Sequence, residues 1–237
     1  MRRIAVLASG RGSNLDALQR YLDALGARAA ATIALVVCDR ASAGALALAH
    51  ALGIDARVAA PSAEHAAQLG GLLSEFDIDL LVLAGWVRHV PDDVVRAFRG
   101  RLVNVHPALL PAFGGQGMYG ARVHRAVLDA GARITGVTAH FVDETYDRGA
   151  IIAQWPVPVA PGDTAESLAA RVLRVEHLLY PRAVQAVAAG RVSLDDQGRA
   201  VWTGDAPRRG LIFVPEPVED HELARYIDDA LDPRACS

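Results

Sequence analysis

The chain has 237 residues, of which 52% are hydrophobic, and its formal net charge is -3 at pH 7. This length suits one α/β domain with or without a tail, and the acidic balance counts against a nucleic-acid partner. All 24 residues counted as Lys or Arg are arginine, which excludes a Schiff-base lysine and a Walker-type phosphate loop.

Neither the apolar runs nor the cysteines suggest a membrane or secreted protein. No apolar run reaches the roughly 18–20 residues that a membrane helix needs. The run at 4–8 is too short for a signal peptide and is interrupted at Gly10 and Arg11, so it predicts a buried strand. The two cysteines, Cys38 in an apolar run and Cys236 near the C-terminus, are not expected to form a disulfide framework, which favours a reducing, cytoplasmic location.

Short apolar runs alternate with helical segments over the first hundred residues. This pattern predicts a doubly wound, mostly parallel α/β sheet with a Rossmann-like N-terminal half. Strands are expected at 4–8, 32–38, 56–59, 79–84 and 102–105, and helices at 13–25, 42–52, 63–76 and 91–100. Ser13 or Asn14 is expected to cap the first helix. Ligands of such sheets bind at the carboxyl ends of the strands, which directs attention to the residues after each run.

The pattern changes after Pro107. A glycine-rich loop at 110–120 is followed by an expected helix, two strands and a long helix, at 122–130, 134–142, 150–159 and 164–189. Asp163 and Thr164 supply the cap of the long helix. Residues 1–192 are expected to form one domain. Residues 193–237 are expected to be an extension of unknown role, with one helical piece at 220–231.

A glycine-containing segment, SGRGSN at 9–14, follows the first strand. Glycines let the backbone approach an anion, and the N-terminus of the following helix favours negative charge, so a phosphate is the expected ligand. An NAD-type site is the alternative, because Asp39 follows the second strand; however, Leu15 stands where the dinucleotide fingerprint needs glycine. A tight turn without a ligand is a further alternative.

Asn104 and His106 lie at the end of the fifth strand. Residues two apart in a strand face the same side, so the two side chains can point at one ligand atom. Both can donate hydrogen bonds, and two converging donors stabilise the oxyanion that forms when a carbonyl becomes tetrahedral. The alternative is a pair of polar core residues bonded to nearby loops.

Three acidic residues, Asp143, Glu144 and Asp147, cluster between the last two strands. A carboxylate close to His106 would raise the pKa of the imidazole and could accept a proton. Spacing does not select among the three, and a solvated acidic turn is the alternative. The histidines and cysteines show no metal-ligand spacing, and no GxSxG segment is present, so neither a metal site nor a serine hydrolase is expected.

Several segments together resemble the phosphoribosylglycinamide formyltransferases, a folate-dependent family of purine synthesis. They include SGRGSNLDAL at 9–18, LVNVHPALLPAF at 102–113 and GVTAHFVDETYDRG at 136–149. The resemblance covers about residues 3–192. It implies that the formyl group of 10-formyltetrahydrofolate is transferred to the amine of glycinamide ribonucleotide, without a metal.

The resemblance also implies roles for particular residues. Asn104, His106 and Asp147 would be catalytic. The residues implied for the substrate phosphate and ribose are Gly12, Ser13, Asn14 and Glu176. Those implied for the folate are Val87, Arg88, His89, Val90, Asp143 and Glu144. The expected partners are the ribonucleotide and a reduced folate, with neither nucleic acid nor membrane, and the chain is expected to be a monomer or homodimer.

Other functions remain open at this point. A hydrolase that deformylates the same folate would share Asn104, His106 and Asp147 but would need no phosphate loop. A formyltransferase acting on a sugar nucleotide or a tRNA would need a nucleotide pocket or a basic face. A non-catalytic nucleotide-binding module would use only residues 10–14, and it would leave Asn104 and His106 without a purpose.

Overall fold

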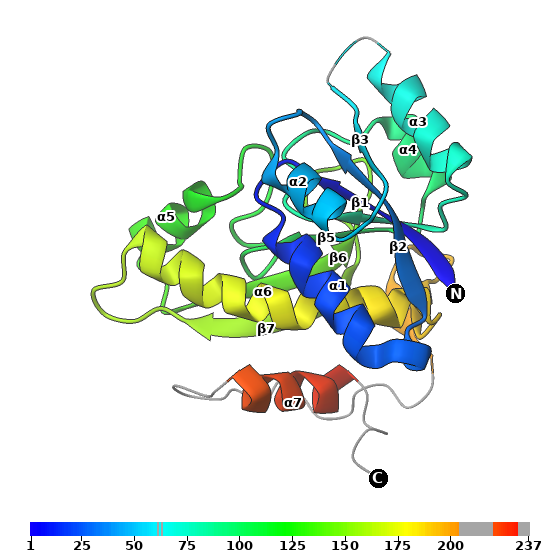
Figure 1. Ribbon diagram of the computed structural model, residues 1–237. Coiled ribbons are helices and arrows are strands. Elements are labelled where there is room, and N and C mark those ends of the chain that lie inside the picture. The colour runs from blue at the N-terminus through cyan, green and yellow to red at the C-terminus, as the bar shows by residue number, and fades with distance from the viewer. Residues whose placement is uncertain (61, 63, 204–219, 232–237) are drawn as a thin grey trace.

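A seven-stranded sheet forms the centre of the protein in the computed structural model, which describes residues 1–60, 62, 64–203 and 220–231 (Figure 1). The strand order is β3-β2-β1-β4-β5-β6-β7. Strands β1 to β5 pair in parallel, whereas β6 pairs antiparallel with both β5 and β7. The expected mostly parallel, doubly wound α/β sheet is therefore confirmed.

The strands of this sheet are β1 (Arg2–Ala8), β2 (Ala31–Cys38), β3 (Ala56–Val58), β4 (Leu80–Leu83), β5 (Leu102–His106), β6 (Ile134–Phe141) and β7 (Ile151–Pro158). The helices up to residue 188 are α1 (Ser13–Leu25), η1 (Gly26–Arg28), α2 (Gly44–Ala51), α3 (His65–Glu75), α4 (Asp92–Ala97), α5 (Ala121–Asp129) and α6 (Ala165–Ala188). No helix of the described residues is long and apolar enough to cross a membrane.

Helices cover both faces of the sheet, because successive side chains of each strand point to opposite sides. In β1, Ile4 and Val6 belong to the core that packs against α1, α2, α5 and α6. Their neighbours Ala5 and Leu7 belong to the second core, beneath α3 and α4. Burial on both faces explains why these strands read as continuous apolar runs.

The chain order places a ligand-binding edge beside β1. The chain passes outward from β1 to β2 and β3, then returns to β4 on the other side of β1. The loops that follow β1 and β4 therefore diverge, which leaves a crevice at the carboxyl ends of these strands. The expected ligand segment at 9–14 spans the first of these loops and the start of α1, and the segment at 87–90 lies in the second loop.

The structure confirms one of the two expected helix caps and contains one strand pair that was not predicted. The N-cap of α1 is Gly12, in the left-handed region (φ 90°), and no side chain caps the helix, so the expectation of a Ser13 or Asn14 cap is wrong. In α6 the expected cap is confirmed, because Thr164 accepts from the Ser167 amide. The antiparallel pair β8 (Val192–Leu194) and β9 (Ala200–Trp202) was not predicted.

The described part of the C-terminal extension packs on the rest of the protein. Helix α7 (Asp220–Leu231) lies alongside α6 (Figure 1) and buries Leu223 and Ile227 in the main core. Two ion pairs join the helices, Arg174 with Asp220 at 2.6 Å and Arg182 with Asp228 at 2.5 Å. The boundary at 192 stays a prediction. Cys38 is a free, buried thiol, and Cys236 lies outside the described residues.

Candidate functional site

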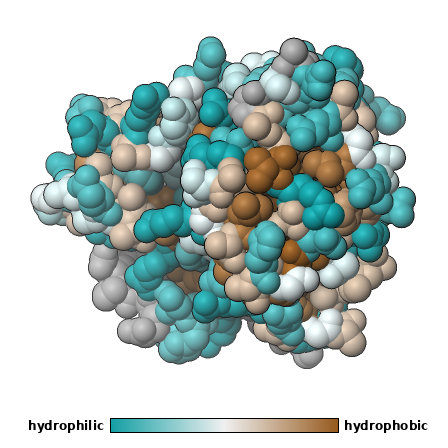
Figure 2. Space-filling view, turned by 45° about the horizontal axis from the view of Figure 1, so that its top comes forward, coloured by the Kyte–Doolittle hydropathy of each residue, from teal (hydrophilic) through white to brown (hydrophobic). Residues whose placement is uncertain are grey.

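A cavity of about 710 Å³ opens at the carboxyl ends of β4 and β5. Its walls come from the loop after β4, the glycine-rich loop before α5, the loop between β6 and β7, and one face of α6. Hydrophobic side chains are also exposed among hydrophilic ones on one face of the molecule (Figure 2). The exposed hydrophobic residues Val87 and Tyr146 line the cavity, and they are 41% and 42% exposed.

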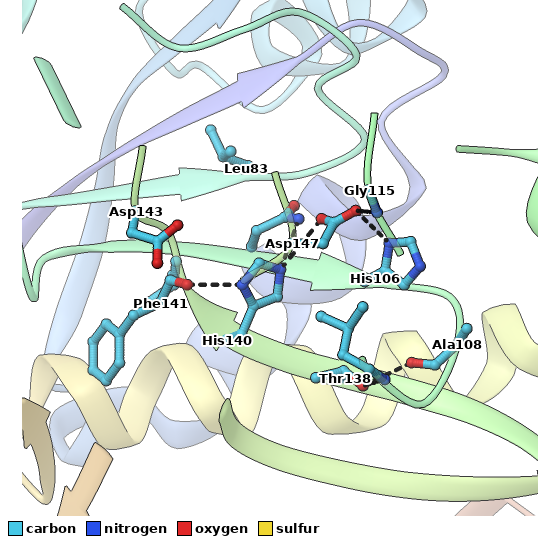
Figure 3. A network of polar contacts seen from close by, with 12 residues as sticks. Leu83, His106, Ala108, Gly115, Thr138, His140, Phe141, Asp143 and Asp147 are labelled. Carbon is cyan, nitrogen blue, oxygen red and sulfur yellow. Dashed lines mark hydrogen bonds and ion pairs between the residues drawn. The ribbon is translucent and has the colours of Figure 1, made fainter. Parts of the chain in front are cut away.

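Asn104, His106, His140 and Asp147 all line this cavity. Figure 3 shows His106 and His140 on either side of Asp147. The sheet register sets Asn104 directly opposite His140, and the Asn104 Nδ2 lies 3.1 Å from the His140 Nε2. The His140 Nδ1 lies 2.7 Å from the Phe141 carbonyl oxygen, which can only accept. His140 therefore carries its proton on Nδ1, and its Nε2 accepts from Asn104.

Asp147 joins the two histidines of this network. One carboxylate oxygen of Asp147 lies 3.5 Å from the His106 Nδ1 and accepts the Gly115 amide at 2.9 Å. The other lies 3.8 Å from the His140 Nε2. Of the three loop acids, Asp147 is thus the one that reaches His106, a choice that spacing alone left open.

Burial and the neighbouring acceptors shift the pKa of His106 in opposite directions. Burial lowers the pKa of His106 below its ordinary value of 6.5, and this outweighs the Asp147 carboxylate and the Phe113 carbonyl, which raise the pKa. Asp147 thus raises the pKa of His106, as expected of a nearby carboxylate, but burial of the ring, which is only 3% exposed, has the larger effect. Its Nε2–H donates to the Phe113 carbonyl at 2.9 Å.

Unusual backbone geometry holds this network. Phe113 and Asp147 both have positive φ, 56° and 55°, a conformation that costs free energy in residues other than glycine. Between their loops, a Cβ on Gly114 would lie 2.5 Å from the Leu110 side chain and 3.2 Å from Asp147. The glycine at 114 therefore permits the close approach of the two loops that carry the acceptor of His106 and the carboxylate.

One end of the cavity is bounded by α1 and α6. Asn14 and Glu176 both line it, and the Asn14 amide donates to the Glu176 carboxylate at 2.8 Å. Burial raises the pKa of Glu176 to about 7, although the hydrogen bond from Asn14 lowers it. Gly12 and Ser13 lie at the start of α1, whose first amides have no helical partner, but they are not among the residues that line the cavity.

The other end of the cavity contains all the residues that the resemblance implied for the folate. They are Val87, Arg88, His89, Val90, Asp143 and Glu144. The two loops that carry them touch at His89 and Tyr146, whose rings pack edge to face at 5.5 Å. The buried indole of Trp86 lines the same end.

Asp39 is not placed to bind the ribose of a nucleotide. Its side chain is fully buried, its carboxylate pairs with Arg88 at 3.1 Å and with Arg40 at 3.5 Å, and it does not line the cavity. The NAD-type alternative depended on this residue. The structure therefore removes its support.

Sequence reasoning missed several cavity residues. His140, Tyr146 and His124 line the cavity, and the first completes the network around Asn104. The signal for His140 was present, because an antiparallel strand following β5 sets one of its residues opposite Asn104. Within the described ranges, no group of three or more His, Cys, Asp or Glu residues is placed to hold a metal ion.

Comparison with known proteins finds relatives that are named as formyltransferases. Residues 2–184 match the formyl transferase family. The chain is 40% identical over 197 residues to a chloroplastic phosphoribosylglycinamide formyltransferase of Vigna unguiculata, which covers 81% of this chain and 62% of that protein. It is 35% identical to the Bacillus subtilis phosphoribosylglycinamide formyltransferase, over 78% of this chain and 94% of that one. The crystal structure of the enzyme of that name from Anaplasma phagocytophilum superposes with a TM-score of 0.78 at 36% identity, covering 86% of this chain and 95% of the other.

Proposed function

Because the chain belongs to the formyl transferase family, we propose that it is a phosphoribosylglycinamide formyltransferase of purine synthesis. It transfers the formyl group of 10-formyltetrahydrofolate to the amine of N1-(5-phospho-D-ribosyl)glycinamide. One observation carries the proposal. A single cavity is lined by the buried Asn14–Glu176 pair, by the loops at 87–90 and 143–144, and by Asn104, His106 and Asp147.

The two ends suit the two substrates. The start of α1, with Gly12, Ser13 and Asn14, offers backbone amides and side-chain donors to a phosphate, and Glu176 can bind ribose hydroxyls nearby. The loop end offers apolar surface with polar groups at its edge, which suits a flat pteridine. This arrangement brings the amine of one substrate and the formyl carbon of the other to the centre of the cavity.

The reaction is a direct transfer. The glycinamide nitrogen attacks the formyl carbon and forms a C–N bond, and the bond from that carbon to N10 of the folate then breaks. The proton lost by the amine is accepted by Asp147, directly or through water, and is returned to N10, which gives the formylated ribonucleotide and tetrahydrofolate. No covalent intermediate with the protein is needed.

Asn104 and His106 stabilise the oxyanion of the tetrahedral intermediate. The Asn104 amide has two N–H groups, of which His140 takes one, so the other is available to the formyl oxygen. His106 donates through Nε2–H, and the formyl oxygen must replace the Phe113 carbonyl as its acceptor. Asp147 then favours a positive charge on the ring as negative charge develops on the oxygen.

A single assay tests the function. The purified protein is incubated with 10-formyltetrahydrofolate, with and without glycinamide ribonucleotide, and tetrahydrofolate release is followed. Release that depends on the ribonucleotide supports the proposal. Release at the same rate without it would identify the rival hydrolase, in which water takes the place of the amine.

The location and assembly of the protein stay predictions. The cytoplasm is expected from the cysteine content, whereas the Vigna relative is named as chloroplastic. Whether the chain is a monomer or a homodimer is tested by its mass in solution across a range of protein concentrations.

A further inference from the structure

Three loops pack together at the carboxyl ends of β1, β2 and β4. The Ser9 amide donates to the Gly85 carbonyl at 3.2 Å, and the Ser9 hydroxyl accepts the Val87 amide at 3.2 Å. The loop after β2 closes on the first from the other side, because the Ala45 amide donates to the Gly10 carbonyl at 3.1 Å. The segment expected to bind phosphate therefore lies against the wall expected to bind folate.

A buried carboxylate lies where these loops meet. Asp39, directly after β2, has a side chain with no exposed surface. One of its oxygens accepts from the Arg88 Nε at 3.1 Å and lies 3.5 Å from the Arg40 guanidinium. Arg40 also donates to the Ser9 carbonyl, so the acid and both arginines link all three loops.

The physical chemistry of this pair favours a role in orienting Arg88. A buried carboxylate is tolerated only where cations and hydrogen bonds compensate its lost hydration. Arg88 provides the shorter contact, yet half of its side chain is exposed and it lines the cavity. Asp39 therefore holds the Nε edge of the guanidinium, and no contact with Asp39 involves the terminal N–H groups of this cavity-lining residue.

We propose that Asp39 is a positioning residue for the folate: it fixes the Arg88 guanidinium at the folate end of the cavity. The inference rests on the proposed function, because it takes the ligand of that end to be a reduced folate. Asp39 itself does not line the cavity and acts only through Arg88. A variant that weakens the pair should therefore weaken folate binding while leaving the formyl transfer step intact.

The test measures the Kd of 5-formyltetrahydrofolate by isothermal titration calorimetry, together with KM for each substrate and kcat. Asp39→Asn removes the charge and is expected to raise the folate Kd and KM by about three- to tenfold, as for the net loss of one ordinary hydrogen bond. The expected kcat and ribonucleotide KM are unchanged. Asp55→Asn is the matched control, since Asp55 pairs with Arg57 at the surface, away from the cavity.

A double-mutant cycle separates positioning from a general loss of structure. Arg88 is half-exposed, so Arg88→Ala is expected to keep the fold. The effect of Asp39→Asn on the folate Kd is then measured in the Arg88→Ala variant as well as in the wild-type protein. If Asp39 acts through Arg88, Asp39→Asn has no further effect on the folate Kd in that background.

The outcomes are distinguishable. A wild-type folate Kd in Asp39→Asn, or an equal effect of the substitution with and without Arg88, would overturn the inference while leaving the function intact. Failure of the wild-type protein to bind 5-formyltetrahydrofolate at all would refute the proposed function and the inference with it.

Discussion

The two ends of the cavity are built from different parts of the fold. The end that we assign to the ribonucleotide is formed by helices, and its polar residues Asn14 and Glu176 are 8% and 9% exposed. The end that we assign to the folate is formed by loops, and Val87 and Tyr146 are 41% and 42% exposed. Helices packed in a core fix side chains tightly, whereas loops adjust to a larger ligand.

Most of the reacting groups lie on strands rather than on helices or loops. Asn104 and His106 belong to β5, and His140 lies opposite on β6, so the sheet itself fixes their spacing. Only Asp147 comes from a loop, and its contact with the Gly115 amide ties that loop down. The comparison predicts that changes at the centre reduce kcat, those at the helical end affect stability and the ribonucleotide, and those at the loop end affect the folate.

The largest effect is expected at the centre of the cavity. Asn104→Ala should lower kcat by a factor on the order of 10²–10³, because one donor to the oxyanion is lost. KM for both substrates should change little, since Asn104 belongs to neither end. Steady-state kinetics measures the loss, and the circular dichroism spectrum checks that the variant folds. Near-wild-type turnover would contradict the assignment of Asn104.

The loop acid at the centre is expected to behave like Asn104. Asp147→Asn should also lower kcat by a factor on the order of 10²–10³, because it removes the proton acceptor and the charge beside His106. Asp143→Asn, four residues earlier at the folate end, is the matched comparison and should affect the folate KM more than kcat. The assignment fails if Asp143→Asn reduces kcat as much as Asp147→Asn does.

The buried carboxyl group of Glu176, at the helical end, should make the free energy of unfolding depend on pH. The pKa of Glu176 is about 7 in the folded protein against an ordinary 4.5, so the folded state binds this proton more tightly than the unfolded state. The stabilisation is complete below pH 4.5 and is lost as the pH rises through 7. It amounts to about 3 kcal/mol at most, at 1.36 kcal/mol for each pKa unit.

Glu176→Gln cannot ionise and should lose this dependence. Urea unfolding at pH 5 and pH 8 should show the wild-type protein weakening relative to the variant at the higher pH. Glu166→Gln, on the exposed first turn of the same helix, serves as the control. Parallel pH profiles for the wild-type protein and Glu176→Gln would show that Glu176 is not the group responsible.

The smallest effect is expected at the loop end. Tyr146→Ala removes a ring that packs against His89 and should raise the folate KM by roughly two- to fivefold, as for the loss of one exposed aromatic contact. Tyr146→Phe keeps the ring and should match the wild-type protein. A change in the ribonucleotide KM instead would break the division between the two ends.

Much of the fold was predictable because its signals are local. Strands β1, β2 and β4 are buried on both faces and so form apolar runs, and the predicted bounds differ from the observed ones by only a few residues. The hairpin β8–β9 was missed because both strands have three residues and carry little periodicity. The cap of α1 was misplaced because Gly12, with its positive φ, takes the position that Ser13 or Asn14 was expected to fill.

Asn104 and His106 could be recognised from the sequence alone as candidates for the centre of the site. Asn104 and His106 share a face at a strand end, and this follows from the two-residue period of any strand. The family resemblance implied Asp147 among three neighbouring acids, but only the tertiary structure set Asp147 within 3.5 Å of His106, His140 beside Asn104 and Asp39 against Arg88. It also added the burial that lowers the pKa of His106, because a pKa depends on burial by distant segments as well as on the nearest carboxylate.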